Sequence, residues 1–170
     1  MDMAVTKIVT VALLGLVHLA SAATQTPSIK RCSGSTASDI IAFDDVTLSS
    51  VKVGGTMKLD YSIELKQKVD GSPQLKFTMT SGSSTLPCIG EVGSCTYKLC
   101  GATGKVEKQV AEAWNNKCPI AAGTYTNSVS AQIPSLAGVL IQGNSIHIKI
   151  EGKNNGKTLG CVEFDVHIEK

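Results

Sequence analysis

Six cysteines set the strongest limit on how this chain can fold. Two stand near the ends of the chain and four lie close together in the stretch from Leu86 to Tyr125: Cys32 and Cys161, then Cys88, Cys95, Cys100 and Cys118. All six follow a segment that resembles a secretory signal, and an even number of cysteines in an exported chain predicts a disulfide framework. Six cysteines allow fifteen pairings, so the count alone leaves the connectivity open.

The first 22 residues have the features of a secretory signal peptide. A short region ending at Lys7 precedes an apolar run from Ile8 to Leu19 and the small residues Ala20, Ser21 and Ala22. The run is too short to span a bilayer. Residues 23–170 are expected to form one domain, because about 150 residues suffice for a single hydrophobic core. The formal charge of +2 gives no indication of a nucleic-acid partner.

Alternation of apolar and polar residues predicts an all-β protein. Strands are predicted over residues 40–48, 56–66, 75–79, 95–99, 123–133, 146–151 and 162–168, and the alternation is strict in residues 56–66. The turn-forming residues 70–73 predict that strands 56–66 and 75–79 pair antiparallel. Asn155-Gly156 predicts a tight hairpin, and a change of parity predicts a bulge near Gly160. The fold class is an antiparallel two-sheet sandwich or cup.

Two segments depart from the strand pattern. Residues 104–116 form the only predicted helix, since Val106, Val110, Ala113 and Trp114 recur at spacings of three and four with charged residues between them. Residues 136–141 form an apolar patch that is too irregular for a strand face and too apolar for an ordinary exposed loop.

The sequence offers little for catalysis. It lacks the G-x-S-x-G, H-E-x-x-H and phosphate-binding glycine motifs. His147 and His167 fall on polar strand faces, where a solvated or surface-paired histidine is expected, and the adjacent Asp44 and Asp45 would point to opposite faces of a strand. There is also no C-x-x-C pair for a metal. We therefore expect a protein that is not an enzyme and binds neither metal nor cofactor.

Three motifs carry a resemblance to a known family. The sequence reads P-C-x-x-x-x-G-S-C-T-(aromatic)-x-x-C from Pro87 to Cys100, then C-P-x-x-x-G-T-Y from Cys118, then Leu159-Gly160-Cys161. In this order and spacing they resemble the ganglioside activators, which are non-catalytic cofactors of β-hexosaminidase A within the ML lipid-recognition family. The resemblance covers residues 86–168.

The resemblance implies a cup whose two sheets splay around an apolar lipid cavity. It also implies three disulfides, Cys32–Cys161, Cys88–Cys95 and Cys100–Cys118. The candidate pocket residues are then the apolar faces of four predicted strands: Met57, Leu59, Tyr61, Ile63, Leu65, Leu75, Phe77, Met79, Ile146, Ile148, Ile150, Val162, Phe164 and Val166. The same faces would equally fill an ordinary sandwich core, and that alternative stays open.

A lid and a rim are expected around the cavity. Trp114, the only tryptophan, would form with Val106 and Val110 a mobile lid that contacts ligand or membrane. The opposite rim would consist of Leu136, Val139, Leu140 and Ile141. The alternative for Trp114 is a plain core anchor.

The expected function is that of a secreted or lysosomal lipid-binding or lipid-transfer protein. It would extract and carry a glycosphingolipid or phospholipid, contact membranes transiently, and present the lipid to a lysosomal glycosidase as an activator. The alternative is an extracellular signalling or innate-defence protein whose pocket holds a small apolar ligand. The segment between Cys100 and Cys118 is shorter than in the activators and lacks their further cysteines, which weighs against docking to the enzyme more than against lipid binding. No N-x-S/T sequon is present, so the secreted and the lysosomal destination both stay open.

Overall fold

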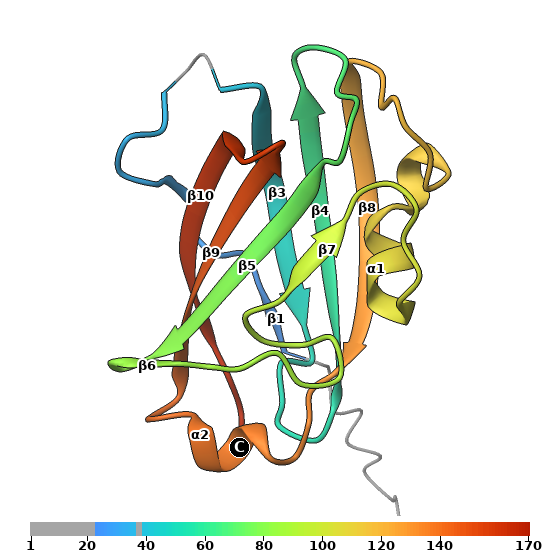
Figure 1. The fold of residues 1–170 in the computed structure, drawn as a ribbon. Coiled ribbons are helices and arrows are strands. Elements are labelled where there is room, and N and C mark those ends of the chain that lie inside the picture. Colours follow the sequence, from blue (N-terminus) through green and yellow to red (C-terminus); the bar gives the residue numbers. More distant parts are fainter. Residues whose placement is uncertain (1–22, 37–38) are drawn as a thin grey trace, which may run out of the picture.

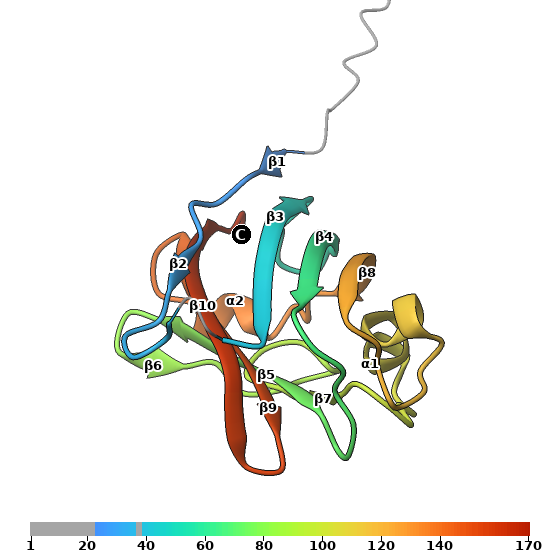
Figure 2. The same cartoon turned by 90° about the horizontal axis from the view of Figure 1, so that it is seen from above.

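The computed structural model describes residues 23–36 and 39–170, so the signal peptide predicted for residues 1–22 lies outside the described residues. Two antiparallel sheets face each other (Figures 1 and 2). The first sheet has the order β1-β3-β4-β8, built from β1 (Thr24–Gln25), β3 (Ile41–Ser49), β4 (Thr56–Leu65) and β8 (Gly123–Gln132). The antiparallel two-sheet fold predicted from alternation is confirmed.

The second sheet has the order β2-β10-β9-β5-β6. Its strands are β2 (Lys30–Arg31), β10 (Lys157–His167), β9 (Ser145–Asn154), β5 (Gln74–Ser81) and β6 (Ser84–Thr85), and β7 (Thr96–Lys98) pairs with the first part of β5. The two-residue strands β1, β2 and β6 were not predicted, because segments this short and polar carry no periodic signal.

The predicted pairing of strands 56–66 and 75–79 is wrong. These strands are β4, whose neighbours are β3 and β8, and β5, whose long neighbour is β9 in the other sheet. The connection over residues 66–73 is longer than the loops of about two to five residues that join hairpins. Midway, Val69 exchanges two backbone hydrogen bonds with Ile120, at 2.8 and 2.7 Å. The connection is therefore anchored away from both strands and carries the chain between sheets.

The last two strands form the predicted hairpin. Asn155 and Gly156 both have positive φ, 48° and 78°, and the register shifts between Thr158 and Gly160, which confirms the predicted bulge. A Cβ at Gly160 would lie 2.2 Å from the carbonyl oxygen of Ile41, and one at Gly152 would lie 2.5 Å from the Ile41 side chain. The two glycines thus let the sheets approach closely at the end of the molecule that carries this hairpin.

Three helical turns complete the fold. Helix α1 (Lys105–Val110) is followed by the 3-10 turn η1 (Glu112–Trp114), so the single helix predicted over residues 104–116 is broken at Ala111. Both turns pack against β8 at the side of the sandwich (Figure 1). The irregular apolar patch contains the short helix α2 (Ala137–Leu140), which lies at the end of the molecule opposite the β9–β10 turn.

The structure has three disulfides, Cys32–Cys161, Cys88–Cys95 and Cys100–Cys118. This is the pairing that the family resemblance implies. It leaves no free cysteine among the described residues. None of the helices in the described part of the chain has the length and apolar character needed to cross a membrane.

Candidate functional site

Three adjoining apolar cavities lie between the sheets, and we name them by their distance from α2. The mouth cavity, of about 50 Å³, shares Leu48, Met57 and Met79 with a middle cavity of about 30 Å³. The middle cavity shares Leu59, Tyr61 and Phe77 with an upper cavity of about 10 Å³. Since neighbouring cavities have walls in common, they form one interrupted channel along the strands.

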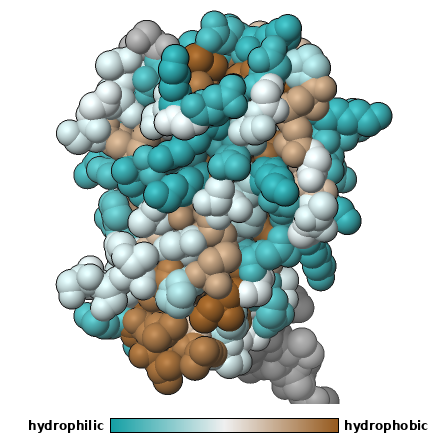
Figure 3. All heavy atoms as spheres, viewed as in Figure 1, coloured by the Kyte–Doolittle hydropathy of each residue, from teal (hydrophilic) through white to brown (hydrophobic). Residues whose placement is uncertain are grey.

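The mouth cavity lies beside the most hydrophobic part of the surface. Among the described residues, the large apolar side chains that are exposed all belong to the α2 segment: Leu136 at 58%, Val139 at 78% and Leu140 at 36%. Figure 3 shows this apolar cluster at the end where Figure 1 places α2. Leu140 and the buried Ile141 also line the mouth cavity. This α2 surface is therefore continuous with the channel.

The loop closed by the Cys88–Cys95 disulfide forms one wall of the channel. Ile89 and Gly93 line the mouth cavity, Glu91 the middle one, and Val92 both. The Glu91 carboxylate accepts hydrogen bonds from the first backbone N–H groups of α1, those of Lys105, Val106 and Glu107, at 2.8, 3.2 and 3.3 Å. A carboxylate there satisfies N–H groups that have no partner within the helix. This loop was not among the predicted pocket residues, although the apolar Ile89 and Val92 between two cysteines could have indicated a buried wall.

Most predicted pocket residues line the channel, and three do not. Met57, Leu59, Tyr61, Leu75, Phe77, Met79, Ile146, Ile148, Ile150, Phe164 and Val166 each contribute to at least one of the three cavities. Ile63 and Leu65 are buried at the other end of β4, where the sheets approach through Gly152 and Gly160. Val162 lines a separate, half-polar crevice beside Cys161. The close approach of the sheets explains why the channel ends before Ile63.

The channel is much smaller than we expected. A pocket for a lipid-sized ligand has a typical volume of about 300–1,000 Å³. The largest of the three cavities measures about 50 Å³. Side chains such as Met57 and Met79 occupy the space between the sheets, so in this conformation the channel is smaller than a lipid-sized pocket.

Trp114 packs inside the molecule and does not lie at the rim where a lid was predicted. Its side chain is 8% exposed and lines none of the three channel cavities, and its indole N–H donates a hydrogen bond to the Leu99 carbonyl. The indole ring meets the Tyr125 ring edge to face, with centroids 5.6 Å apart. Val106 and Val110 are buried as well and line the middle cavity. The apolar stripe of this segment faces inward because it packs against β8.

Two buried tyrosines line the middle cavity. Tyr97 donates a hydrogen bond to the Glu91 carbonyl at 2.7 Å, and burial, followed by the charges of Glu91 and Glu107, raises the pKa of Tyr97. Tyr61 is 5% exposed and accepts a hydrogen bond from the Asn127 side chain at 3.3 Å. Burial raises the pKa of Tyr61 to about 12, against the lowering effect of that hydrogen bond. Both hydroxyls therefore stay protonated at physiological pH.

Glu107 is a buried carboxylate that the helical pattern placed on a polar face. It is 9% exposed and accepts hydrogen bonds from the backbone N–H groups of Lys98, Thr103 and Gly104, at 2.7, 2.8 and 3.4 Å. Burial alone would raise the pKa of Glu107, but these donors and the Lys98 charge together lower it. The ionised carboxylate thus joins α1 to β7 and to the loop before the helix.

Replacing Glu107 with glutamine is expected to destabilise the fold by about 1.5–3 kcal/mol at pH 7, because charge-assisted hydrogen bonds are lost. A lowered folded-state pKa gives stability that is present above the unfolded pKa and lost as pH falls through the folded value. The difference between wild type and Glu107→Gln in urea unfolding should therefore shrink below about pH 4.3. The exposed Glu112→Gln is the control and should show no such convergence. A difference that stays constant down to pH 3 would contradict this role for Glu107.

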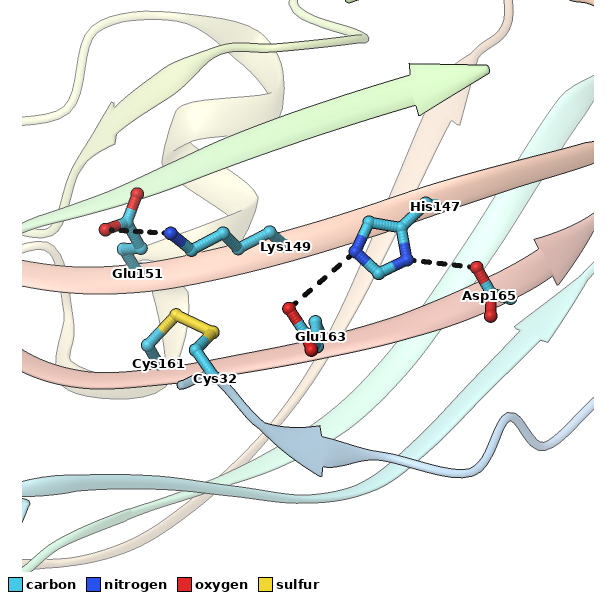
Figure 4. Close-up of polar contacts among 7 residues, drawn as sticks. All are labelled: Cys32, His147, Lys149, Glu151, Cys161, Glu163 and Asp165. Carbon is cyan, nitrogen blue, oxygen red and sulfur yellow. Dashed lines mark hydrogen bonds and ion pairs between the residues drawn. A yellow bond between two sulfur atoms is a disulfide. The ribbon is translucent and has the colours of Figure 1, made fainter. Parts of the chain in front are cut away.

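The histidines lie outside the channel. His147 lies on the outer face of the second sheet, with Nδ1 3.0 Å from Asp165 and Nε2 3.8 Å from Glu163 (Figure 4). The two carboxylates face different ring nitrogens, so they do not converge with the imidazole on one point. Within residues 23–36 and 39–170, no three His, Cys, Asp or Glu side chains cluster as a metal site would.

Comparison with known proteins shows which family has this fold. No curated protein matches the chain. The crystal structure of a Niemann-Pick type C2 protein from the Japanese carpenter ant has a TM-score of 0.54 at 16% identity, covering 84% of this chain and 99% of that chain, so the two share a fold. The C-terminal domain of wzt has a TM-score of 0.44 at 7% identity, covering 85% of this chain and 78% of that chain, which is too low to carry an argument. A sequence model of the ML domain matches residues 27–168, and the chain therefore belongs to the ML domain family of lipid-recognition proteins.

Proposed function

We propose that the protein binds a lipid between its two sheets and carries it between membranes, without catalysing a reaction. The observation that supports this most directly is the apolar channel that begins beside the exposed α2 surface. The exposed Leu136, Val139 and Leu140 provide a contact with a membrane, because apolar side chains are stabilised at the lipid interface. A lipid leaving that membrane would meet the mouth cavity first.

Binding requires the channel to widen. The cavities of about 50 and 30 Å³ are separated by shared side chains, among them Met57 and Met79. Methionine has an unbranched side chain with several rotatable bonds and repacks at low cost. Rotation of these two side chains, with displacement of α2, would join the mouth and middle cavities into one pocket.

The ligand that we propose is a glycosphingolipid or a phospholipid, whose presentation to a lysosomal glycosidase would make the protein an activator. The cysteine motifs that resemble the ganglioside activators support this. The small cavities favour the second candidate, an extracellular signalling or defence protein that holds one small apolar ligand. Three disulfides are consistent with folding in the oxidising lumen of the endoplasmic reticulum, through which secreted and lysosomal proteins both pass.

Mass spectrometry of lipids extracted from protein purified from its natural source tests the proposal. A mixture of membrane lipids in stoichiometric amount would support the carrier. A single small apolar compound would support the second candidate. The absence of any lipid, together with no uptake from vesicles of phosphatidylcholine and ganglioside, would overturn both.

Replacing Leu136 and Val139 together with aspartate is expected to slow lipid transfer between vesicles at least about tenfold, since each side chain contributes about 1–2 kcal/mol of apolar contact with the membrane. Folding should change by less than about 0.5 kcal/mol, because both side chains are exposed. Transfer of a fluorescent lipid and thermal unfolding measure the two effects. The control is Gln67→Asp, an exposed site in the connection after β4. Equal transfer rates for the two variants would rule out the α2 surface as the membrane contact.

A further inference from the structure

The Tyr61 hydroxyl is a buried hydrogen-bond donor without an acceptor. Tyr61 on β4 lies opposite Asn127 on β8 and lines the middle and upper cavities. Its oxygen accepts a hydrogen bond from Asn127 Nδ2 at 3.3 Å. Among the hydrogen bonds of the described residues, the hydrogen of this hydroxyl has no acceptor, although every buried side-chain nitrogen and oxygen there has some partner.

The orientation of the Asn127 amide is fixed by its other contacts. Nδ2 also donates to the backbone carbonyls of Gln109 and Val110, at 2.8 and 2.9 Å, and Oδ1 accepts from the Ser128 N–H at 3.0 Å. An amide turned the other way would place its oxygen against two carbonyl oxygens. The two Nδ2 hydrogens are shared among three acceptors, and the longest contact is the one to Tyr61. Because an amide nitrogen cannot accept a hydrogen bond, the Tyr61 hydroxyl cannot donate to Nδ2, and its own hydrogen must find a partner elsewhere.

The neighbouring Tyr97 shows the usual alternative. Tyr97 lines the same cavity, but its hydroxyl donates to the Glu91 carbonyl at 2.7 Å, so this donor is used within the protein. A water molecule at Tyr61 would need about two to four polar partners. Apart from Tyr61, the polar residues that line the middle cavity are Glu91 and Tyr97, and the other lining side chains are apolar.

We propose that the Tyr61 hydroxyl donates a hydrogen bond to an uncharged oxygen at the buried end of the bound lipid, and so selects lipids that carry a hydroxyl, carbonyl or ester group at that end. The oxygen is uncharged because an anion would be desolvated in an apolar cavity that Glu91 also lines. This inference rests on the proposed function. Tyr61 is four residues along β4 from Met57 at the mouth, about 13 Å at the rise of a strand.

The test compares the affinities of two proteins for a fatty acid and for its hydroxylated form, at three chain lengths. Decanoate, dodecanoate and hexadecanoate are each paired with the acid that carries a hydroxyl on its last carbon, and dissociation constants are measured for wild type and for Tyr61→Phe. Phenylalanine keeps the ring and removes only the hydroxyl. For the chain length that reaches Tyr61, wild type should bind the hydroxylated acid at least as tightly as the plain one. Tyr61→Phe should lower the affinity for the hydroxylated acid about tenfold relative to the affinity for the plain acid.

The matched control is Tyr97→Phe, which removes the hydroxyl that already has an acceptor. It should leave the ratio of the two affinities as in wild type, and thermal unfolding of both variants checks that the fold is kept. If wild type binds the plain acids but the affinity ratio is the same in wild type and Tyr61→Phe at all three lengths, this inference is overturned and the proposed function stands. If wild type binds neither the acids nor any vesicle lipid, both this inference and the proposed function are overturned.

Discussion

Replacing Trp114 with alanine is expected to lower the free energy of unfolding by about 3–5 kcal/mol, the usual cost of removing a large buried aromatic side chain. The indole is 8% exposed and packs edge to face on Tyr125. Its loss would leave a cavity under η1 and an unpaired carbonyl at Leu99, which now accepts the indole N–H. The cavity falls in the segment closed by the Cys100–Cys118 disulfide, and Leu99 lies directly before that segment.

Urea unfolding followed by circular dichroism measures this effect. Two controls separate its causes: Trp114→Phe keeps a ring but loses the N–H donor, and Val139→Ala truncates a side chain that is 78% exposed. Val139→Ala should change stability by less than about 0.5 kcal/mol. The emission of Trp114 should be that of a buried indole and should not move when vesicles are added. A loss of unfolding free energy below about 1 kcal/mol, or a blue shift of the Trp114 emission with vesicles, would support a lid role for Trp114 instead.

Replacing both Cys32 and Cys161 with serine is expected to cost about 4–5 kcal/mol in the chain-entropy model. The disulfide spans 129 residues and joins the segment after β2 to β10. Without it, the unfolded chain gains the conformational freedom of almost the whole fold. Domains of this size are stable by only about 5–15 kcal/mol, so the variant would lose about a third or more of the original stability.

The comparison with Cys88→Ser/Cys95→Ser makes this test specific. That bridge spans seven residues, and its removal should cost about 2–3 kcal/mol in the same model. The ratio between the two losses, measured by urea unfolding of the purified proteins, therefore tests the effect of loop length. A larger loss for the short bridge would show that local packing of the Cys88–Cys95 loop outweighs chain entropy.

The local patterns of the sequence were enough for the strands. The alternating residues of β4 and β9, the Asn155-Gly156 turn and the bulge at Gly160 are all present as predicted. These features depend on a period of two and on which residues tolerate positive φ, and both are properties of a few consecutive residues. The cysteine motifs likewise indicated the ML family, because they can be recognised in the sequence alone.

Pairings between residues that are far apart in the sequence could not be predicted in the same way. The pairing of β4 with β8 instead of β5 depends on where the connection at Val69 is anchored, and that anchor is Ile120, far along the chain. No partner for Glu107 is visible in the sequence, because its partners are backbone N–H groups, which every residue type except proline supplies.

The same distinction between local and distant information applies to the candidate site. Sequence alternation was sufficient to say which side chains turn inward, since each strand face follows from its own residues. Whether inward side chains fill a core or border a channel depends on the separation of two sheets, and here Gly152 and Gly160 close one end while α2 covers the other. The inward direction of Trp114 and the unused donor of Tyr61 came only from the folded chain, because each depends on contacts between elements that are distant in the sequence.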